Sequence, residues 1–474
     1  MRRAFLLLMF WGSMPVILID PFLGIVYYTL NSIIRPEQLL WGDASAVGRI
    51  FLAVQGLSFL SWIINKGKLT PEYTPLPFQI KLLWFVAFTM TIVSFHAALF
   101  PDWSWQWTSG FWKMTILCFI MVKAFNTAKK LELYYALTLL WYVLLAIWGI
   151  QQKLGGNVRM EGLGGTQLPD VNSLASVYIL YFPLTYYSVF SKKKWIKLYI
   201  AIPSFVIFVV FILFGGSRGA FLGLALCLAY IFVRSKGLQK IKMVFTFIIL
   251  GALLVGTLSQ LAPEGFFDEY TARLATMLGQ KNETTGETKR EASASGRTAM
   301  WKGAIYIYRN HPEYWLMGVG MNSYRLMYMR HIDELAGYLD SEELTLVLFG
   351  GHGGKDIHNT FLSVLLGGGM FVFVPWVFLI LYAWRQACII PKKYPRFVDG
   401  VDIHNYARAL EIGIVGYCLC VAFLTMEFND IFYWHLTMVG VITNLGKAKL
   451  KREELGQEEE EWGEEPRRSF AYSS

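Results

Sequence analysis

The sequence predicts an all-α membrane protein, a polytopic bundle of about 12 or 13 transmembrane helices with one large extracytoplasmic loop. Of its 474 residues, 55% are hydrophobic and only 16% are charged, whereas soluble proteins carry about 25% charged residues. Apolar runs of about 20 residues, the length that crosses the hydrocarbon core, recur along the chain. Short basic clusters separate these runs, as in cytoplasmic loops beside anionic lipid. This distribution of the net charge of +9 argues against a nucleic-acid partner.

The first apolar stretch, 4–34, is too long for one ordinary span, and Asp20-Pro21 divides it, so it crosses the membrane once or twice. Pro15 also interrupts the stretch and no small-residue cleavage site follows, so we expect retained helices and no cleavable signal peptide. The further candidate spans lie at 46–64, 78–99, 109–125, 131–150, 172–190, 195–213, 217–233, 242–261, 357–382, 407–426 and 430–446.

The five cysteines lie within or beside apolar segments and show no CxxC spacing. We interpret them as small buried hydrophobic residues that form neither a disulfide framework nor a metal site. They are Cys118, Cys227, Cys388, Cys418 and Cys420.

The positive-inside rule assigns a side to each loop. Basic residues such as Lys192, Lys193 and Lys194 recur in alternate loops, which we place in the cytoplasm. The opposite side holds 100–110, which has no Lys or Arg and whose tryptophans are typical of an interfacial belt. The longest loop, 262–356, then faces away from the cytoplasm. The predicted organisation is N-terminal transmembrane helices in 1–150, further transmembrane helices in 151–261, the large loop in 262–356, C-terminal transmembrane helices in 357–446 and a charged cytoplasmic tail in 447–474.

Two parts of the large loop differ in character. Residues 282–296 are low in hydrophobicity, and we expect them to be mobile. In 297–309, Trp301, Ile305 and Tyr308 recur at helical spacing, which predicts an amphipathic helix lying on the membrane or on the bundle.

Two arginines on the extracytoplasmic side are candidates for chemistry. Arg218 stands in Phe214-Gly-Gly-Ser-Arg-Gly219 at the mouth of a span, where a charge is costly and is a functional candidate by default. The flanking glycines let a ligand approach the backbone closely. Arg297 begins the amphipathic segment. The structural alternatives are a snorkelling arginine and a solvated one.

His358 lies where the loop re-enters the membrane. An imidazole titrates near neutral pH and can accept a proton from a hydroxyl nucleophile, with Asp356 or Asn359 orienting it. The structural alternative is a histidine that caps a helix. His352, within Gly350-Gly-His-Gly-Gly354, is a weaker candidate.

The group of two arginines and a histidine indicates a functional site more strongly than any one of these residues alone. Arginine forks bind phosphate oxygens with two parallel hydrogen bonds, and a nearby histidine suggests transfer chemistry on a phosphate-bearing substrate. The sequence has no DxD pair, HExxH motif or clustered His/Cys ligands, so we expect no metal. We expect the arginines to neutralise the phosphate charge, as a metal does in other transferases. Adjacent carboxylates, which we interpret as solvated, occur at Asp268-Glu269, Asp333-Glu334 and Glu342-Glu343.

Several short motifs resemble, in order and spacing, those of the O-antigen ligase and O-antigen polymerase superfamily over about 150–380. They are Leu168-Pro-Asp-Val-Asn-Ser-Leu174, Gly215-Gly-Ser-Arg-Gly219, Arg297 with Trp301, Gly318-Val-Gly-Met-Asn-Ser-Tyr324, and Asp356-Ile-His-Asn-Thr-Phe-Leu362 followed by Gly367-Gly-Gly369. The N-terminal Asp20-Pro-Phe-Leu-Gly24 and Arg35-Pro-Glu-Gln-Leu-Leu-Trp-Gly42 are similar to O-glycosylation ligases associated with exosortase systems. The glycine-rich insertion around His352 departs from the pattern.

The resemblance implies a multi-spanning glycosyltransferase of the GT-C type in the bacterial inner membrane. Its donor would be a glycan on undecaprenyl pyrophosphate, used at the periplasmic face without metal or other cofactor and with inversion at the sugar. Arg218 and Arg297 would hold the pyrophosphate, and His358 would deprotonate the acceptor hydroxyl. The residues implied in substrate binding are Arg159, Asn172, Ser217 and Asn359.

Three functions remain open at this point. A ligase would transfer the glycan to a lipid A core or to a protein hydroxyl, whereas a polymerase would extend the glycan itself. A polysaccharide transporter is the alternative from another class, but transporters usually carry their charges near the bilayer midplane on broken helices. Here the charges gather at one face beside a large loop, which favours chemistry at the membrane surface.

Overall fold

The computed structural model describes residues 2–34, 50–69, 75–155, 168, 170–235, 292–349 and 357–455, together with single residues between 237 and 260. Almost all of these residues are helical, and the sheet among them is one antiparallel pair, β1 (Phe397–Val398) with β2 (Val401–Asp402). The predicted all-α class is confirmed. The sequence-based predictions that lie outside the described residues concern Arg159, 35–42, most of 242–261, 262–291, His352, Asp356 and the tail beyond 455.

Four described helices are long and apolar enough to cross a membrane. They agree with four of the predicted spans, and the protein is an integral, polytopic membrane protein. They are α6 (Phe78–His96), α8 (Ala128–Leu154), the continuous segment of η2 (Ile196–Ala201) and α10 (Ile202–Gly215), and α19 (Thr360–Lys393).

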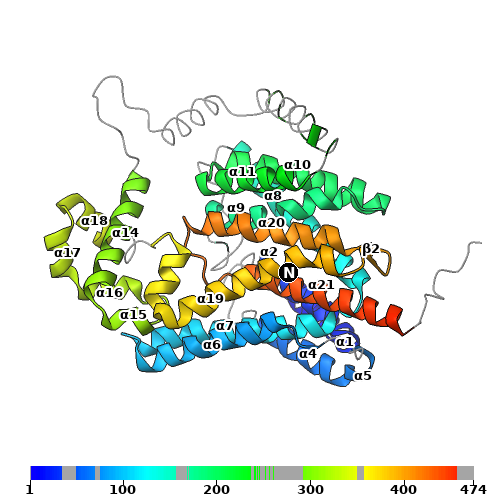
Figure 1. The fold of residues 1–474 in the computed structure, drawn as a ribbon, viewed down its shortest axis with the longest axis horizontal. Coiled ribbons are helices and arrows are strands. Elements are labelled where there is room, and N and C mark those ends of the chain that lie inside the picture. Colours follow the sequence, from blue (N-terminus) through cyan, green and yellow to red (C-terminus); the bar gives the residue numbers. More distant parts are fainter. Residues whose placement is uncertain are drawn as a thin grey trace, which may run out of the picture.

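The bundle contains further described helices. They are α1 (Arg2–Ile19), α2 (Pro21–Ile34), α4 (Ile50–Ile64), α5 (Lys66–Leu69), α7 (Pro101–Ala124), α9 (Val171–Ser188), α11 (Arg218–Arg234), α20 (Ile403–Val421) and α21 (Asp430–Glu454). Helix α20 contacts α9, α11 and α19, and α6 contacts α7 and α19, so these helices run alongside one another (Figure 1). All residues of α9 except Asn172 and Tyr186 are buried, because this helix lies at the centre of the bundle.

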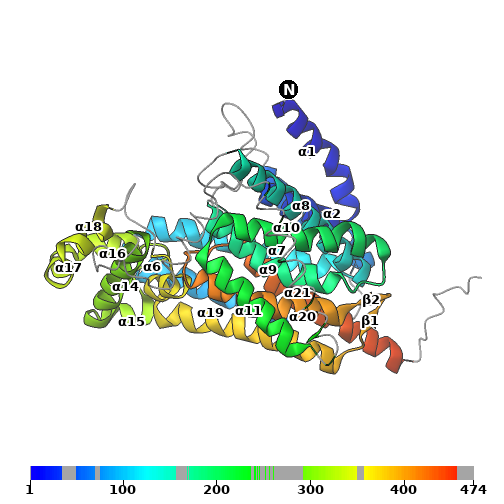
Figure 2. The ribbon, with the colours of Figure 1, turned by 90° about the horizontal axis from the view of Figure 1, so that it is seen from above.

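The second half of the large loop forms a helical unit at one end of the bundle, which both views show (Figures 1 and 2). It has its own apolar core, in which Met300, Ile307 and Leu335 are buried. This unit consists of α14 (Ala292–Asn310), α15 (Glu313–Met317), α16 (Tyr324–Arg330), α17 (Ile332–Tyr338) and α18 (Ser341–Phe349).

Glycines attach this loop unit to α19. The N–H groups of Val319 and Gly320 donate to the carbonyls of Leu366 and Gly367, each at 2.9 Å. This contact joins two of the glycine motifs that the sequence analysis singled out. We therefore interpret Gly318–Gly320 and Gly367–Gly369 as a docking element between the loop unit and the bundle.

Three of these glycines, Gly318, Gly320 and Gly369, have backbone conformations that other residues rarely adopt, and two of them lie directly against backbone atoms. Gly318 has φ +66°, and a Cβ there would lie 2.4 Å from the Leu366 oxygen. Gly369 has φ +58°, and a Cβ there would lie 2.3 Å from the Leu316 oxygen. A side chain at either position would therefore push the two backbones apart.

Several boundaries differ from those expected; for example, α19 runs to Lys393 beyond the predicted end at 382, and α21 runs to Glu454 beyond the predicted end at 446. The segment 100–110 was expected to be a connection, but α7 already begins at Pro101, because Pro fits the first helical position and Asp102 suits the positive end of the helix dipole. Likewise, α14 begins at Ala292, so Arg297 lies in its second turn, and 292–296, expected to be mobile, is helical.

The predicted division of 4–34 is confirmed. Helix α1 ends at Ile19 and α2 begins at Pro21. The Asp20 carboxylate accepts a hydrogen bond from the Phe22 N–H at 2.9 Å, which satisfies one of the unpaired donors at the start of α2.

Candidate active site

Arg218 is the first residue of α11, directly after a tight turn that ends α10. The turn is closed by Gly216 in the left-handed conformation, with φ +59°. Ser217 is buried at the N-cap position and Arg218 is half-buried. The first N–H groups of a helix have no partner within the helix and favour anions. A guanidinium at this place therefore stands beside a second group of anion-binding donors.

The start of α11 lies against the end of α20. The Cys420 thiol donates to the Gly219 carbonyl at 3.4 Å. A Cβ on Gly219 would be 3.6 Å from the Cys420 oxygen and 3.9 Å from the Phe423 Cβ. This close approach places the residue after Arg218 beside the chain that leaves α20.

His358 precedes α19 and contacts the same chain. Its backbone has φ +50°, an uncommon conformation for a residue with a side chain. Its N–H donates to the Thr425 Oγ1 at 3.0 Å. Asn359 is the N-cap of α19, because its side-chain oxygen accepts from the Leu362 N–H at 3.0 Å.

Thr360 reinforces this connection. Its hydroxyl donates to the Leu424 carbonyl at 2.7 Å and accepts from the Met426 N–H at 2.9 Å. The first turn of α19 and the chain after α20 are therefore joined on both sides of the His358–Thr425 hydrogen bond. The backbone that carries His358 is held from outside its own helix.

Arg297 is placed near His358 by Trp301, which lies one turn further along α14. The Trp301 Nε1 donates to the Ile357 carbonyl at 2.7 Å, and its ring centroid lies 6.2 Å from that of Phe423. Residues four apart share one face of a helix. Arg297 is half-buried, and its Nε is buried. The anchoring of Trp301 thus fixes the helix face that carries Arg297 beside the residue before His358.

The elements that carry the three candidates therefore lie beside one segment, residues 422–429, which we call the α20–α21 connection. Phe423 lies beside Gly219 of α11 and pairs with the Trp301 ring, and the Thr425 hydroxyl accepts a hydrogen bond from the His358 N–H. Sequence reasoning missed this segment because most of it was assigned to the span 407–426. The signal that marks it is the run of polar residues after an apolar helix, Thr425, Glu427 and Asn429.

Glu427 is a buried carboxylate within the α20–α21 connection. Its Oε1 accepts from the Ser363 hydroxyl, in the first turns of α19, at 2.6 Å. Its backbone carbonyl accepts from the Tyr433 hydroxyl, also at 2.6 Å. Tyr433 in turn accepts from the Trp376 Nε1 at 2.8 Å. This network ties the connection to both α19 and α21, and no sequence motif predicted it.

Asn172 lies in the first turn of α9, where Asp170 is the N-cap. On α11, Gly223 lies beside Cys420 of α20 and Arg234 forms an ion pair with Glu411. On α9, Ile179 lies beside Gly416 of α20, and Ser188 lines the same cavity as Tyr406. Both helices therefore run antiparallel to α20 and begin at the same end of the bundle. The described structure thus places Asn172 at the end that carries Arg218, without a described contact to the α20–α21 connection.

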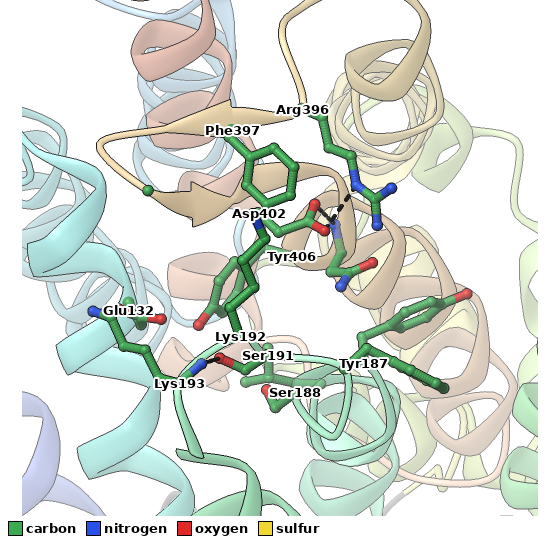
Figure 3. A pocket seen from close by; sticks show the side chains of 14 residues that line it. Glu132, Tyr187, Ser188, Ser191, Lys192, Lys193, Arg396, Phe397, Asp402 and Tyr406 are labelled. Carbon is green, nitrogen blue, oxygen red and sulfur yellow. Dashed lines mark hydrogen bonds and ion pairs between the residues drawn. The ribbon is translucent and has the colours of Figure 1, made fainter. Parts of the chain in front are cut away.

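A cavity of about 90 Å³ lies at the other end of these helices (Figure 3). Lys193 forms an ion pair with Glu132 there, and the Arg396 Nε lies 2.9 Å from the Asp402 Oδ2. Ser188, the last residue of α9, lines it, and the helix rise puts Asn172 roughly 24 Å away. The cavity is lined by none of the candidate residues, and its charged lining consists of Lys192, Lys193, Arg396, Glu132 and Asp402.

Comparison with known proteins finds one matching family. A family model described as O-Antigen ligase matches residues 203–377, a range that includes Arg218, Arg297 and His358. It leaves out α1 to α9, α20 and α21. A comparison with curated proteins finds no match. The predicted resemblance to the O-antigen ligase and polymerase superfamily is confirmed by the family match.

Proposed function

We propose that this protein transfers a glycan from undecaprenyl pyrophosphate to an acceptor hydroxyl. The premise is the match of residues 203–377 to the O-antigen ligase family. The family is one of ligase- and polymerase-type membrane enzymes. The observation that carries the finer proposal is the convergence of α11, α14 and the start of α19 on the α20–α21 connection. It brings the elements that carry two arginines and a histidine to one end of an apolar bundle.

Arg218 and Arg297 are assigned to the pyrophosphate. A guanidinium presents a planar fork of donors that matches two phosphate oxygens, and it keeps its charge at every physiological pH. The N–H groups at the start of α11 add donors on the same side as Arg218. Together these groups would stabilise the negative charge that grows on the leaving group, which is the larger part of the catalytic task in such transfers.

His358 is assigned as the general base. The acceptor oxygen forms a bond to the anomeric carbon of the donor sugar while its proton moves to the imidazole of His358. The bond between that carbon and the pyrophosphate oxygen breaks, and undecaprenyl pyrophosphate leaves with the electron pair. Attack from the side opposite the leaving group inverts the sugar configuration. The hydrogen bond to Thr425 supports this role, because it holds the His358 backbone.

We place this chemistry at the periplasmic face of a bacterial inner membrane. The support is the charge asymmetry of the helices. Lys392 and Lys393 end α19, and Lys192, Lys193 and Arg396 surround the cavity at the same end. Basic residues favour the cytoplasmic side, which leaves the end with the α20–α21 connection in the periplasm.

A reconstituted assay tests the proposal. The full-length protein in proteoliposomes is given an undecaprenyl-pyrophosphate-linked glycan, with and without a lipid A core or protein acceptor. A ligase forms a glycosylated acceptor and leaves the donor chain unchanged when no acceptor is present. A polymerase, which has the same family and motifs, lengthens the lipid-linked glycan with donor alone. Unchanged donor in every arm, with folded protein, contradicts both activities.

The acceptor is identified in cells. Mass spectrometry of the lipopolysaccharide and of membrane proteins, with and without this protein, shows which class of acceptor loses its glycan. Loss from lipid A core supports a lipid ligase, and loss from proteins supports a protein O-glycosylation ligase. No change in either class, with intact lipid-linked glycan, contradicts the ligase proposal.

A further inference from the structure

Two histidines and a glutamate meet in the loop unit, away from the candidate active site. His311 directly follows α14, His331 separates α16 from α17, and Glu334 lies in the first turn of α17. His311 and His331 are twenty positions apart in the chain, so no sequence motif joins them. Their ring centroids are 4.1 Å apart.

The inner nitrogens of both rings face the same carboxylate. The His311 Nε2 lies 2.8 Å from the Glu334 Oε2, and the His331 Nδ1 lies 2.9 Å from the Glu334 Oε1. One ligand atom from each of the three residues lies within 4.8 Å of the others. Ligands of a tetrahedral Zn²⁺ at about 2.1 Å from the ion are roughly 3.4 Å apart. Small side-chain rotations therefore bring the three ligand atoms into a coordination shell.

The outer nitrogen of each ring is also held. The His311 Nδ1 lies 2.9 Å from the Glu313 Oε1, and the His331 Nε2 lies 3.0 Å from the Tyr314 hydroxyl. Metal-binding histidines commonly use their second nitrogen in this way, because the partner fixes the tautomer and orients the ring. Simple surface ion pairs would not require partners for both nitrogens of both rings. The observed arrangement therefore favours a metal site over ion pairs.

Burial supports the same assignment. The side chain of His331 is 8% exposed and that of His311 is 19% exposed, whereas that of Glu334 is 41% exposed. The two imidazoles are thus fixed within the loop unit while the carboxylate side stays open to solvent. An ion has a path to the site without unfolding of the unit.

We propose that His311, His331 and Glu334 form a binding site for a divalent transition-metal ion, with Zn²⁺ as the best match to two imidazoles and one carboxylate. The ion would join the end of α14 to α17, and through Glu313 and Tyr314 to α15. Arg297 lies near the other end of α14, and the rise of a helix separates it from His311 by roughly 20 Å. The ion therefore has a structural role in the loop unit and takes no part in glycan transfer.

Zn²⁺ binding to the full-length protein tests this assignment directly. The protein is purified through an affinity tag that contains no histidine, stripped with a chelator, and titrated with ZnCl₂ by isothermal calorimetry. We expect one ion per chain with a micromolar or lower Kd. We also expect the unfolding temperature to rise with Zn²⁺ concentration, because an ion that binds only the folded state stabilises it.

Matched variants assign the ligands. His311→Ala/His331→Ala should lose the site, and Glu334→Gln, which keeps the shape of the side chain, should weaken binding at least tenfold. His96→Ala, an exposed histidine at the end of α6, should bind like the wild type. If a variant does not fold, the proposal is tested on the wild-type protein alone, by its Zn²⁺ stoichiometry and by the absorption spectrum of bound Co²⁺. The proposal is overturned if the wild-type protein binds no Zn²⁺, or if the double variant binds Zn²⁺ as tightly as the wild type. The three side chains would then form ion pairs only.

Discussion

The backbone N–H of His358 donates to the hydroxyl of Thr425, 67 positions later in the chain, at 3.0 Å. This hydrogen bond holds a histidine with φ +50° at the start of α19. It also places the proposed general base against the segment that contacts the start of α11 and Trp301. The α20–α21 connection is therefore the structural centre of the candidate site, although it carries none of the residues that the sequence motifs identified.

Thr425→Val should lower the rate of glycan transfer about tenfold with little change in KM for the donor. The change removes one hydrogen bond, worth about 0.5–1.5 kcal/mol, and it acts on the position of His358. Thr425→Ser keeps the hydroxyl and should restore most of the rate. Steady-state kinetics of both variants in proteoliposomes measure the rate and the KM. Equal rates for the valine and serine variants would show that the Thr425 hydroxyl does not position His358.

Arg218→Lys should reduce transfer by about 100-fold or more, because an ammonium cannot reproduce the two parallel hydrogen bonds of a guanidinium. The same holds for Arg297→Lys. Arg309→Lys, an exposed arginine near the end of α14, is the matched control and should keep the wild-type rate. Initial rates at saturating donor give the comparison. Wild-type turnover in the Arg218 variant would reduce that residue to a membrane-interface anchor.

Gly369→Ala should destabilise the docking of the loop unit on α19. An alanine in the left-handed conformation costs roughly 1–2 kcal/mol, and its Cβ would also collide with the Leu316 carbonyl. Gly337→Ala, where a Cβ meets nothing within 4 Å, is the control. Limited proteolysis and thermal unfolding should show an earlier transition for the first variant alone. Identical profiles would contradict the docking role of the glycine motifs.

Transfer should continue in excess EDTA, because the arginines are assigned to neutralise the pyrophosphate charge. The Glu334→Gln variant is assayed in parallel, since it separates any effect of the loop metal from an effect on chemistry. Equal initial rates with and without chelator are expected in both proteins at a temperature where both stay folded. A rate lost with EDTA and regained with Mg²⁺ or Mn²⁺ in both proteins would contradict the metal-independent mechanism.

Much of the fold follows from local features of the chain. The apolar runs predicted the helices α6, α8, α10 and α19, and Asp20-Pro21 predicted the division between α1 and α2. Each depends on hydrophobicity or on the missing donor of a proline. The start of α7 at Pro101 was missed because its tryptophan-rich first turns resemble an interfacial loop in composition alone.

The site was predictable only as a set of separate motifs. Arg218, Arg297 and His358 each lie in a recognisable motif, but the contacts that join them come from Phe423 and Thr425, which belong to no motif. The pairing of Gly318 with the Leu366 region and the meeting of His311 with His331 also depend on how distant segments pack. The polar residues after α20 could mark the connection, but a single sequence does not show which distant segments it contacts.

Single-turnover glycan transfer by His358→Asn tests the general-base role of His358 most directly. Asparagine tolerates the left-handed backbone better than most residues, so this variant removes the base while keeping the local fold, and His358→Ala is measured beside it. His404→Ala, at the opposite end of α20, is the control. General-base catalysis contributes about 10²–10⁴-fold. We expect a loss of that size in both His358 variants with normal membrane expression, whereas wild-type transfer by His358→Asn would rule out His358 as the general base.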